Sequence, residues 1–262
     1  MDTDQAAGAS NPRIANVIGV ASGKGGVGKS TVSVLLAQAL AAGGSKVGIL
    51  DADITGPSVP RLLGVDSFRA EADGNKIIPI KSGDGIEVMS INFLMEEETR
   101  PVIWRGPLLS QAVKQFWTDT AWGELDYLVV DLPPGTSDIM LTALQSFPFD
   151  GLVFVATPQD FVSMIVAKAV NMASETKTPA LGLVVNMGTM ICPKCGEEIP
   201  LFSGEGADTP DLGIPILARM PWRTDLAQKR HLLWNGLSPE VRGAAKTLGE
   251  AVVGVLGRTE AR

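Results

Sequence analysis

The sequence is poor in the residues that build disulfide frameworks and closed metal sites. Its 262 residues include two cysteines, Cys192 and Cys195, and one histidine, His231. Two cysteines separated by two residues do not form a disulfide framework, and they supply only half of a four-coordinate metal site. The pair therefore indicates metal or redox chemistry, and the remaining ligands of a metal would have to come from elsewhere.

Other signals are missing as well. No apolar run reaches the length of about 18–20 residues that a membrane-spanning helix requires. The first residues, "MDTDQAAGASNPR", lack a basic region followed by an apolar stretch, so we expect a disordered tail over 1–14 and a cytoplasmic protein. The net charge is −7 and no cluster of Lys and Arg stands out, so neither nucleic acid nor a membrane is an expected partner.

Apolar runs and helical patterns alternate along the chain. Near-continuous apolar runs are typical of parallel strands that are covered on both faces. The alternation predicts one doubly wound α/β domain over 15–262, with a mostly parallel sheet and helices on both faces. We expect strands within 16–22, 46–51, 127–135, 151–157, 180–188 and 213–221, and helices at 31–42, 106–119, 138–146, 160–175 and 238–257.

Two segments interrupt this alternation. Residues 75–93 alternate between apolar and polar and turn at Gly83–Asp84–Gly85, which predicts a small β-hairpin. Residues 188–210 are polar, show no clear period and contain both cysteines. A loop of this length in a compact domain tends to be functional, so we expect a CxxC metal-binding loop there.

The segment "GKGGVGKST", residues 23–31, satisfies the phosphate-loop pattern G-x-x-x-x-G-K-[ST]. Glycines let successive backbone N–H groups point at phosphate oxygens, and the following helix adds its positive end. Lys29 would reach the β- and γ-phosphates, and Ser30 would bind magnesium. A bland flexible turn is a weak alternative because a strand precedes the segment and a helix follows it. The predicted nucleotide-binding residues here are Gly23, Lys24, Gly25, Gly26, Val27, Gly28, Lys29, Ser30 and Thr31.

Carboxylates follow two of the expected strands. Asp131 ends a run of four apolar residues, a position suited to holding a magnesium-bound water. The Pro-Pro-Gly turn that ends at Gly135 is a candidate switch that senses the γ-phosphate. Asp51 and Asp53 would face the same side of an extended strand. The alternative is that Asp53 or Thr55 caps the helix that follows.

The cysteines lie in a C-P-x-C-G pattern that lets two sulfur atoms converge. The glycine permits a turn whose N–H groups can bond the thiolates. A redox dithiol and a zinc half-site are alternatives, although a thioredoxin-type motif would begin a helix directly after a strand. Since the chain has no further cysteine, the simplest way to complete the metal site is a second chain. Two chains together supply the four thiolates that zinc or a [4Fe–4S] cluster requires.

The motifs in combination resemble a known family. "KGGVGKS" is similar to the deviant Walker A motif of the MinD/ParA/nitrogenase-iron-protein class of ATPases. Together with "DADITGPS", "PVIWRGP", "WGELDYLVVDLPPGTSD", "CPKCGE" and "GIPIL", it resembles the Mrp/ApbC-type proteins, which scaffold and carry iron–sulfur clusters. The resemblance covers nearly the whole chain.

This resemblance implies an ATP-hydrolysing, magnesium-dependent homodimer that binds a bridging [4Fe–4S] cluster and delivers it to apo iron–sulfur proteins. Lys24 would reach across the dimer to the partner's phosphates, and Asp53 would orient the attacking water as a catalytic residue beside Lys29. Asp51 would lie closer to magnesium, and Asn186 is a candidate for reading the base edge. The chain departs from the family at Ser137, where glycine is usual, and at residues 221–223, Pro-Trp-Arg instead of Pro-Leu-Asp.

Other functions remain open at this point. A MinD/ParA-like positioning or partitioning ATPase would need a DNA- or membrane-binding feature, and the CxxC pair would have no purpose in it. An electron donor like the nitrogenase iron protein would place its cysteines singly, and a zinc-stapled ATPase dimer would use the same four thiolates. The last helix lacks the basic face and bulky anchors of a membrane-targeting helix, so its apolar stripe is expected in the core: Val241, Ala245, Leu248, Val252 and Val255.

Overall fold

The computed structural model describes residues 13–54, 56–95, 106–159, 164–202 and 213–259. The expected tail, the segment that begins "PVIWRGP", the first turn of the helix expected at 160–175 and the end of the cysteine segment lie wholly or partly outside these ranges.

One sheet forms the centre of the molecule. Its strands are β1 (Ile14–Ser22), β2 (Val47–Asp51), β5 (Ile80–Lys81), β6 (Glu87–Ser90), β7 (Leu125–Asp131), β8 (Gly151–Ala156), β9 (Ala180–Ile191), β10 (Glu198–Pro200) and β11 (Ile216–Trp222). Within the described ranges the order is β10-β9-β8-β1-β7-β2-β6-β5, and β11 also pairs with β9. All pairs are parallel except those made by β5 and β10.

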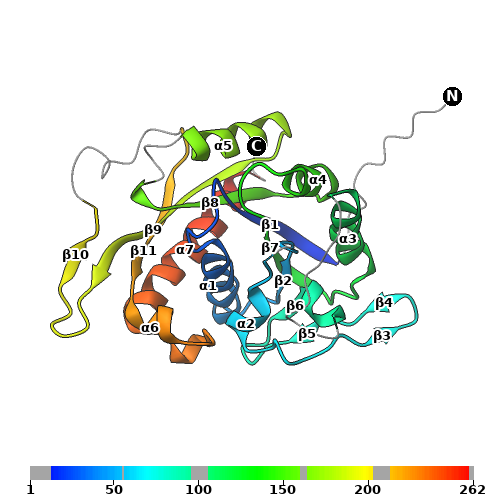
Figure 1. Cartoon of the computed structure of the whole chain (residues 1–262), viewed down its shortest axis with the longest axis horizontal. Helices are drawn as coiled ribbons and strands as arrows, with labels where there is room; N and C mark the ends of the chain where they lie inside the picture. Colours follow the sequence, from blue (N-terminus) through cyan, green and yellow to red (C-terminus); the bar gives the residue numbers. More distant parts are fainter. Residues whose placement is uncertain (1–12, 55, 96–105, 160–163, 203–212, 260–262) are drawn as a thin grey trace.

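Helices cover both faces of this sheet (Figure 1). They are α1 (Lys29–Ala42), α2 (Val59–Leu63), α3 (Gly106–Asp119), α4 (Asp138–Ser146), α5 (Met164–Glu175), α6 (Thr224–Gln228) and α7 (Pro239–Thr259). The helices α1 and α7 pack side by side on one face, and α3, α4 and α5 lie on the other (Figure 1). This arrangement confirms the predicted doubly wound α/β fold. Short 3₁₀ turns occur at η1 (Ile91–Leu94) and η3 (Trp234–Gly236).

The core follows from the apolar runs. All six residues of β8 and the last six of β1 are buried, as expected for strands with helices on both sides. The apolar stripe of α7 packs inward: Val241, Ala245, Leu248 and Val252 are buried and Val255 is half-buried. The prediction that this stripe belongs to the core is therefore confirmed. Among the described helices, none combines the length and apolarity needed to cross a membrane.

The segment 75–93 forms a hairpin in only part of its length. Strands β5 and β6 are antiparallel, and the Ser82 N–H donates to the Ile86 carbonyl across the turn. However, β6 also pairs parallel with β2, so this hairpin forms the edge of the central sheet. The first residues belong to a separate ribbon, β3 (Ala72–Asp73) with β4 (Lys76–Ile77).

The cysteine segment is more regular than its sequence suggests. Strand β9 runs for 12 residues to Ile191, and β10 returns antiparallel to it, so both cysteines lie in the turn of a β-hairpin. Each arm of this hairpin pairs over only three residues, which is too short for alternation to stand out in the sequence. Figure 1 shows the hairpin projecting beyond the helical layers at one side of the molecule.

Candidate functional site

The carboxyl ends of the central parallel strands meet at one edge of the sheet, and the phosphate loop lies there between β1 and α1. Gly26 and Gly28 adopt left-handed conformations, with φ of 83° and 82°, which glycine tolerates without strain. Gly28 caps the N-terminus of α1. The loop lines a cavity of about 310 Å³ that also contacts Asp53, Ser58 and Pro134.

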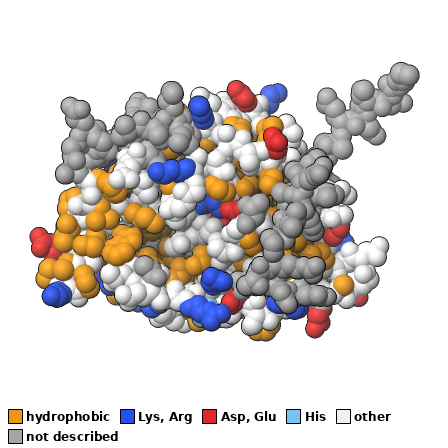
Figure 2. All heavy atoms as spheres, viewed as in Figure 1, with side chains coloured by type: hydrophobic (Ala, Val, Ile, Leu, Met, Phe, Trp, Pro, Cys, Tyr) orange, Lys and Arg blue, Asp and Glu red, His pale blue; other side chains and the backbone are white. Residues whose placement is uncertain are grey.

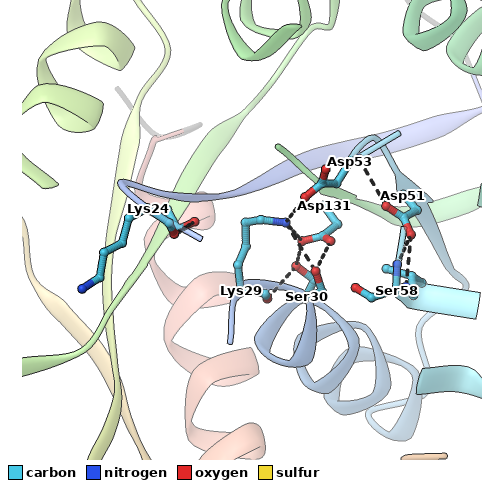
Figure 3. A network of polar contacts seen from close by, with 10 residues as sticks. Lys24, Lys29, Ser30, Asp51, Asp53, Ser58 and Asp131 are labelled. Atoms are coloured by element: carbon cyan, nitrogen blue, oxygen red, sulfur yellow. Dashed lines mark hydrogen bonds and ion pairs between the residues drawn. The ribbon is translucent and has the colours of Figure 1, made fainter. Parts of the chain in front are cut away.

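Asp131 is the centre of the polar network at this edge (Figure 3). Its carboxylate is fully buried and accepts hydrogen bonds from Lys29 Nζ at 2.8 Å and Ser30 Oγ at 2.5 Å. Ser33 Oγ donates to the same carboxylate at 2.7 Å. The structure thus brings together three residues that the motifs place in one site. Ser33 was missed, although its position one helical turn after Ser30 was a usable signal.

The two carboxylates of the "DAD" segment diverge. Strand β2 ends at Asp51, so the alternation expected for residues on one strand does not extend to Asp53. Asp53 Oδ2 lies 3.9 Å from Lys29 Nζ, and the side chain faces the loop (Figure 3). Asp51 instead accepts backbone hydrogen bonds from Asp53, Ser58 and Val59 at 3.0–3.2 Å. The bonds from Ser58 and Val59 satisfy N–H groups at the start of α2.

Asp51 is also the most strongly perturbed carboxyl group of this region. Burial, followed by the negative charge of Asp131, raises the pKa of Asp51 well above its usual value. The positive charge of Lys29 and the Val59 N–H act in the opposite direction. Asp51 and Asp131 are direct neighbours in the parallel register of β2 and β7. The Lys29 ammonium therefore balances two adjacent buried carboxyl groups.

The candidate switch packs against the phosphate loop. Gly135 has φ of 79°, and its N–H donates to the Ser22 carbonyl at 2.8 Å. This bond holds the turn after β7 against the end of β1. The departure at Ser137 has a structural reason, because its hydroxyl caps α4 by accepting from the Met140 N–H at 3.3 Å.

Lys24 is placed differently from the other loop residues. It is exposed, and Figure 3 shows its side chain directed away from Lys29 and Asp131. The structure therefore does not bring Lys24 to the phosphate site of its own chain.

Asn186 lies under the loop, at the end of the buried part of β9. Its Nδ2 donates to the Val27 carbonyl at 2.8 Å, and its Oδ1 accepts from the Met187 N–H at 3.1 Å. It also lines a cavity of about 130 Å³ together with Thr31 and Trp222. Both polar atoms of Asn186 are used within the chain, so its role in reading a base stays a prediction.

The cysteine hairpin is closed by its own backbone. The Cys192 N–H donates to the Glu197 carbonyl, and the Gly196 N–H donates to the Cys192 carbonyl, both at 2.9 Å. Gly196 adopts φ of 76°, the turn expected of the glycine after the second cysteine. Hydrogen bonds from the backbone N–H groups of Cys195 and then Lys194 lower the pKa of the Cys192 thiol. The turn therefore favours the thiolate, which is the form that binds metals.

The hairpin does not complete a metal site by itself. Both thiols are free, and Cys195 is exposed. In the described part of the chain, no group of three or more His, Cys, Asp and Glu side chains is placed to hold a metal ion. His231 bonds the Arg61 carbonyl at 2.9 Å. Within this part of one chain, the two cysteines remain half of a site.

A family model of the ParA class, described as NUBPL iron-transfer P-loop NTPase, matches residues 13–237. The chain belongs to this family. The iron-sulfur cluster carrier protein of Clostridium perfringens is 49% identical over 87% of this chain and 82% of its own length. A nucleotide-binding protein from Archaeoglobus fulgidus, solved in complex with ADP and with cobalt found by PIXE, is 38% identical, with a TM-score of 0.72 over 91% of this chain and 89% of that chain. MinD from Aquifex aeolicus shares the fold at 20% identity, with a TM-score of 0.63 over 92% and 97%.

Membership in the iron-transfer P-loop NTPase family agrees with the resemblance inferred from the motifs. The described site contains the parts that a nucleotide-hydrolysing member of this family needs: a glycine loop, a buried lysine and a strand-end carboxylate. The likeness to MinD shows a common fold and does not extend to function.

The two left-handed glycines of the loop allow a matched test. A Cβ at Gly28 would overlap the Asn186 Nδ2 atom, whereas a Cβ at Gly26 meets no protein atom within 4 Å. Both alanine variants force a non-glycine residue into the left-handed region, at a cost of about 1–2 kcal/mol. We therefore expect similar losses of stability from strain, plus displacement of the loop in Gly28→Ala only.

The measurements are thermal unfolding and titration with MgADP. Gly28→Ala should bind MgADP at least about tenfold more weakly than Gly26→Ala, a difference of about 1.4 kcal/mol. Equal affinities in the two variants would contradict the packing of Asn186 against the loop.

Proposed function

We propose that this chain is an ATP-hydrolysing homodimer that binds a [4Fe–4S] cluster between its subunits and transfers it to apo-proteins. The observation that carries the proposal is the two-cysteine hairpin, which is half of a metal site on the same sheet as a phosphate loop. Family membership and the name of the C. perfringens relative support the assignment.

The residues of the phosphate loop fit a nucleoside triphosphate. The left-handed glycines line the cavity and permit the tight turn that lets backbone N–H groups face phosphates, and the N-terminus of α1 favours negative charge. Lys29 would neutralise the β- and γ-phosphates. Asp53 would orient the attacking water, since its carboxylate borders the same cavity and is the nearer of the two "DAD" carboxylates to the loop.

The donor set at Asp131 fits magnesium. A buried carboxylate and the Ser30 hydroxyl lie 2.5 Å apart, and oxygen donors of this kind are the ligands that Mg²⁺ prefers. Magnesium would neutralise charge that develops on the phosphates. Ser30 and Asp131 are the residues that would hold it, whereas Asp51 would support the site by anchoring the start of α2 through the Ser58 and Val59 N–H groups.

A second subunit would complete the cysteine site. A two-fold axis through the hairpins would join two copies of Cys192 and Cys195 into four thiolates. The surface around the hairpin suits such a contact. Hydrophobic side chains gather over β9, β10 and β11 in Figure 2, and Ile199 and Leu201, within and directly after β10, are among the exposed large apolar residues.

Two other functions would use some of the same features. A zinc-stapled ATPase dimer would use the four thiolates equally well, and only the family favours iron. A positioning ATPase like MinD would share the nucleotide site, but it would leave the thiolate-favouring turn without a purpose.

The test of the proposal is cluster assembly and transfer. After anaerobic reconstitution, iron and acid-labile sulfide should both be bound, and the loaded protein should restore the activity of an apo iron–sulfur enzyme. ATP hydrolysis by the same preparation is measured in parallel. A protein that hydrolyses ATP but retains zinc and no sulfide would refute the carrier function.

A mixed dimer tests the role of Lys24. If Lys24 acts on the partner's phosphates, a dimer of one Lys24→Ala and one Asp53→Ala subunit contains one lesion-free site. Random mixing of equal amounts should then restore about a quarter of wild-type hydrolysis, because half of the dimers are mixed and each has one intact site. Each variant alone should remain nearly inactive.

The control mixes each variant with itself under the same exchange conditions. If subunit exchange is verified by mass and no activity returns, Lys24 does not act across the dimer.

A further inference from the structure

Strand β9 runs from the central sheet into the cysteine hairpin. From Leu181 to Asn186 it is buried in the central sheet between β8 and β11. From Met187 to Ile191 it is half-buried, its last three residues pair with β10 as one arm of the hairpin, and Cys192 follows directly. Any displacement at the boundary between these two parts would therefore reach the cysteines through a single continuous strand.

The boundary between the two parts of β9 is hydrogen-bonded to the phosphate loop. The Asn186 side chain is 6% exposed, and its Nδ2 donates to the Val27 carbonyl at 2.8 Å across 159 residues of sequence. Its Oδ1 accepts from the next backbone N–H, that of Met187, at 3.1 Å. A buried amide with both atoms bonded holds one orientation, because breaking either bond leaves an unsatisfied group. Asn186 thus links the backbone of the loop to the backbone of β9.

The residue after it carries backbone strain. Met187 has φ of 58°, and among the described residues the only other non-glycine residue with positive φ is Lys177. Such a conformation in a residue other than glycine persists only where the surroundings hold it. The Met187 Cε lies 3.3 Å from the position that a Cβ would take at Gly28. Both Asn186 and Met187 therefore pack on the phosphate loop at the point where β9 leaves the core.

We propose that Asn186 is a positioning residue that couples nucleotide binding at the phosphate loop to the conformation of the cysteine hairpin. Phosphates bound by the loop's N–H groups fix its backbone, and the Val27 carbonyl is part of that backbone. The fixed carbonyl holds Asn186, and Asn186 with the strained Met187 sets the direction in which β9 enters the hairpin. The coupling rests on the nucleotide binding of the proposed function, but it requires no metal at the cysteines.

The experiment uses the full-length, metal-free chain with MgADP as the probe. The readout is hydrogen exchange of the Cys192 and Gly196 amides, which close the hairpin turn. In the wild type, saturating MgADP should slow their exchange by at least about threefold, because local opening of the hairpin becomes less frequent. Asn186→Asp keeps the acceptor for Met187 but lacks the donor to Val27, so the slowing should be lost at MgADP concentrations that saturate this variant, whatever its affinity.

Asn92→Asp is the matched control, since Asn92 is another buried asparagine, at 5% exposure, and belongs to η1. It should retain the full slowing. Met187→Gly relieves the left-handed strain and keeps the Asn186 amide, so it should bind MgADP and show a reduced slowing.

Each outcome bears on the proposal separately. MgADP binding to the wild type without a hairpin response would refute the coupling and leave the proposed function standing. Full slowing in Asn186→Asp would refute the role of Asn186. If Asn186→Asp does not bind MgADP, Met187→Gly decides, and undiminished slowing there refutes the proposed route from the loop through Asn186 and Met187. Absence of MgADP binding to the wild type would refute the proposed function and the coupling together.

Discussion

Lys29→Ala should abolish most ATP hydrolysis and also destabilise the protein without nucleotide. Removing a preorganised charge from the phosphates should lower turnover by about 10²–10³-fold. The second effect follows from the ion pair at 2.8 Å between Lys29, 6% exposed, and the fully buried Asp131. Breaking a buried pair by removing one partner costs about 3–5 kcal/mol. Turnover and unfolding by denaturant are the measurements.

The stability loss has a specific cause that a second substitution can relieve. Without Lys29, the adjacent carboxyl groups of Asp51 and Asp131 lose the nearby cation, and the pKa of Asp51, already raised by burial, should rise further. Asp51 then avoids an uncompensated buried charge only while its carboxyl group stays protonated. Lys29→Ala should therefore unfold more easily as the pH rises above the ordinary carboxyl range.

The double variant Lys29→Ala, Asp131→Asn separates catalysis from stability. It removes one buried charge together with its partner, so much of the lost stability should return. Hydrolysis should stay at the level of Lys29→Ala, since both the phosphate-neutralising cation and the magnesium carboxylate are absent. Wild-type turnover in either variant would refute the assignment of the nucleotide site.

The sequence was sufficient to predict the residues of the phosphate loop and their meeting with Asp131. Both are local features: the loop connects one strand to one helix, and carboxyl ends of parallel strands meet at the same edge of a sheet. The roles of Asp51 and Asn186 depended on distant backbone. Asp51 is engaged by N–H groups of Ser58 and Val59, and Asn186 by the Val27 carbonyl, and no spacing rule predicts these contacts.

The structure of the cysteine segment also could not be predicted from its local sequence. Its composition predicted a metal-binding loop, but the polar residues concealed the three-residue pairing of β9 with β10. Pairing of this kind is stabilised by continuity with a strand that is already fixed in the core, and not by the propensity of the segment itself. The regular hairpin sets the two thiols on a turn whose N–H groups favour the thiolate of Cys192.

Cys192→Ser and Cys195→Ser should each abolish cluster binding and leave MgADP binding unchanged. The two cysteines lie at the tip of the hairpin, whereas the nucleotide residues are carried by β1, β7 and α1. With two thiolates per chain and no further ligand group among the described residues, loss of one cysteine per chain removes half of a four-thiolate site. Lys194→Ala is the matched control, because it keeps the backbone N–H that bonds Cys192 and should retain the cluster.

The stoichiometry of the reconstituted wild type is the sharper measurement. A cluster shared between two hairpins should give about four irons and four sulfides per dimer, with the absorbance of a brown iron–sulfur protein. The same sample should run as a dimer on a sizing column. One zinc per dimer with no sulfide would keep the shared geometry and refute the carrier function. A complete cluster on a monomer would refute the shared geometry, because a single hairpin would then have found its other two ligands within its own chain.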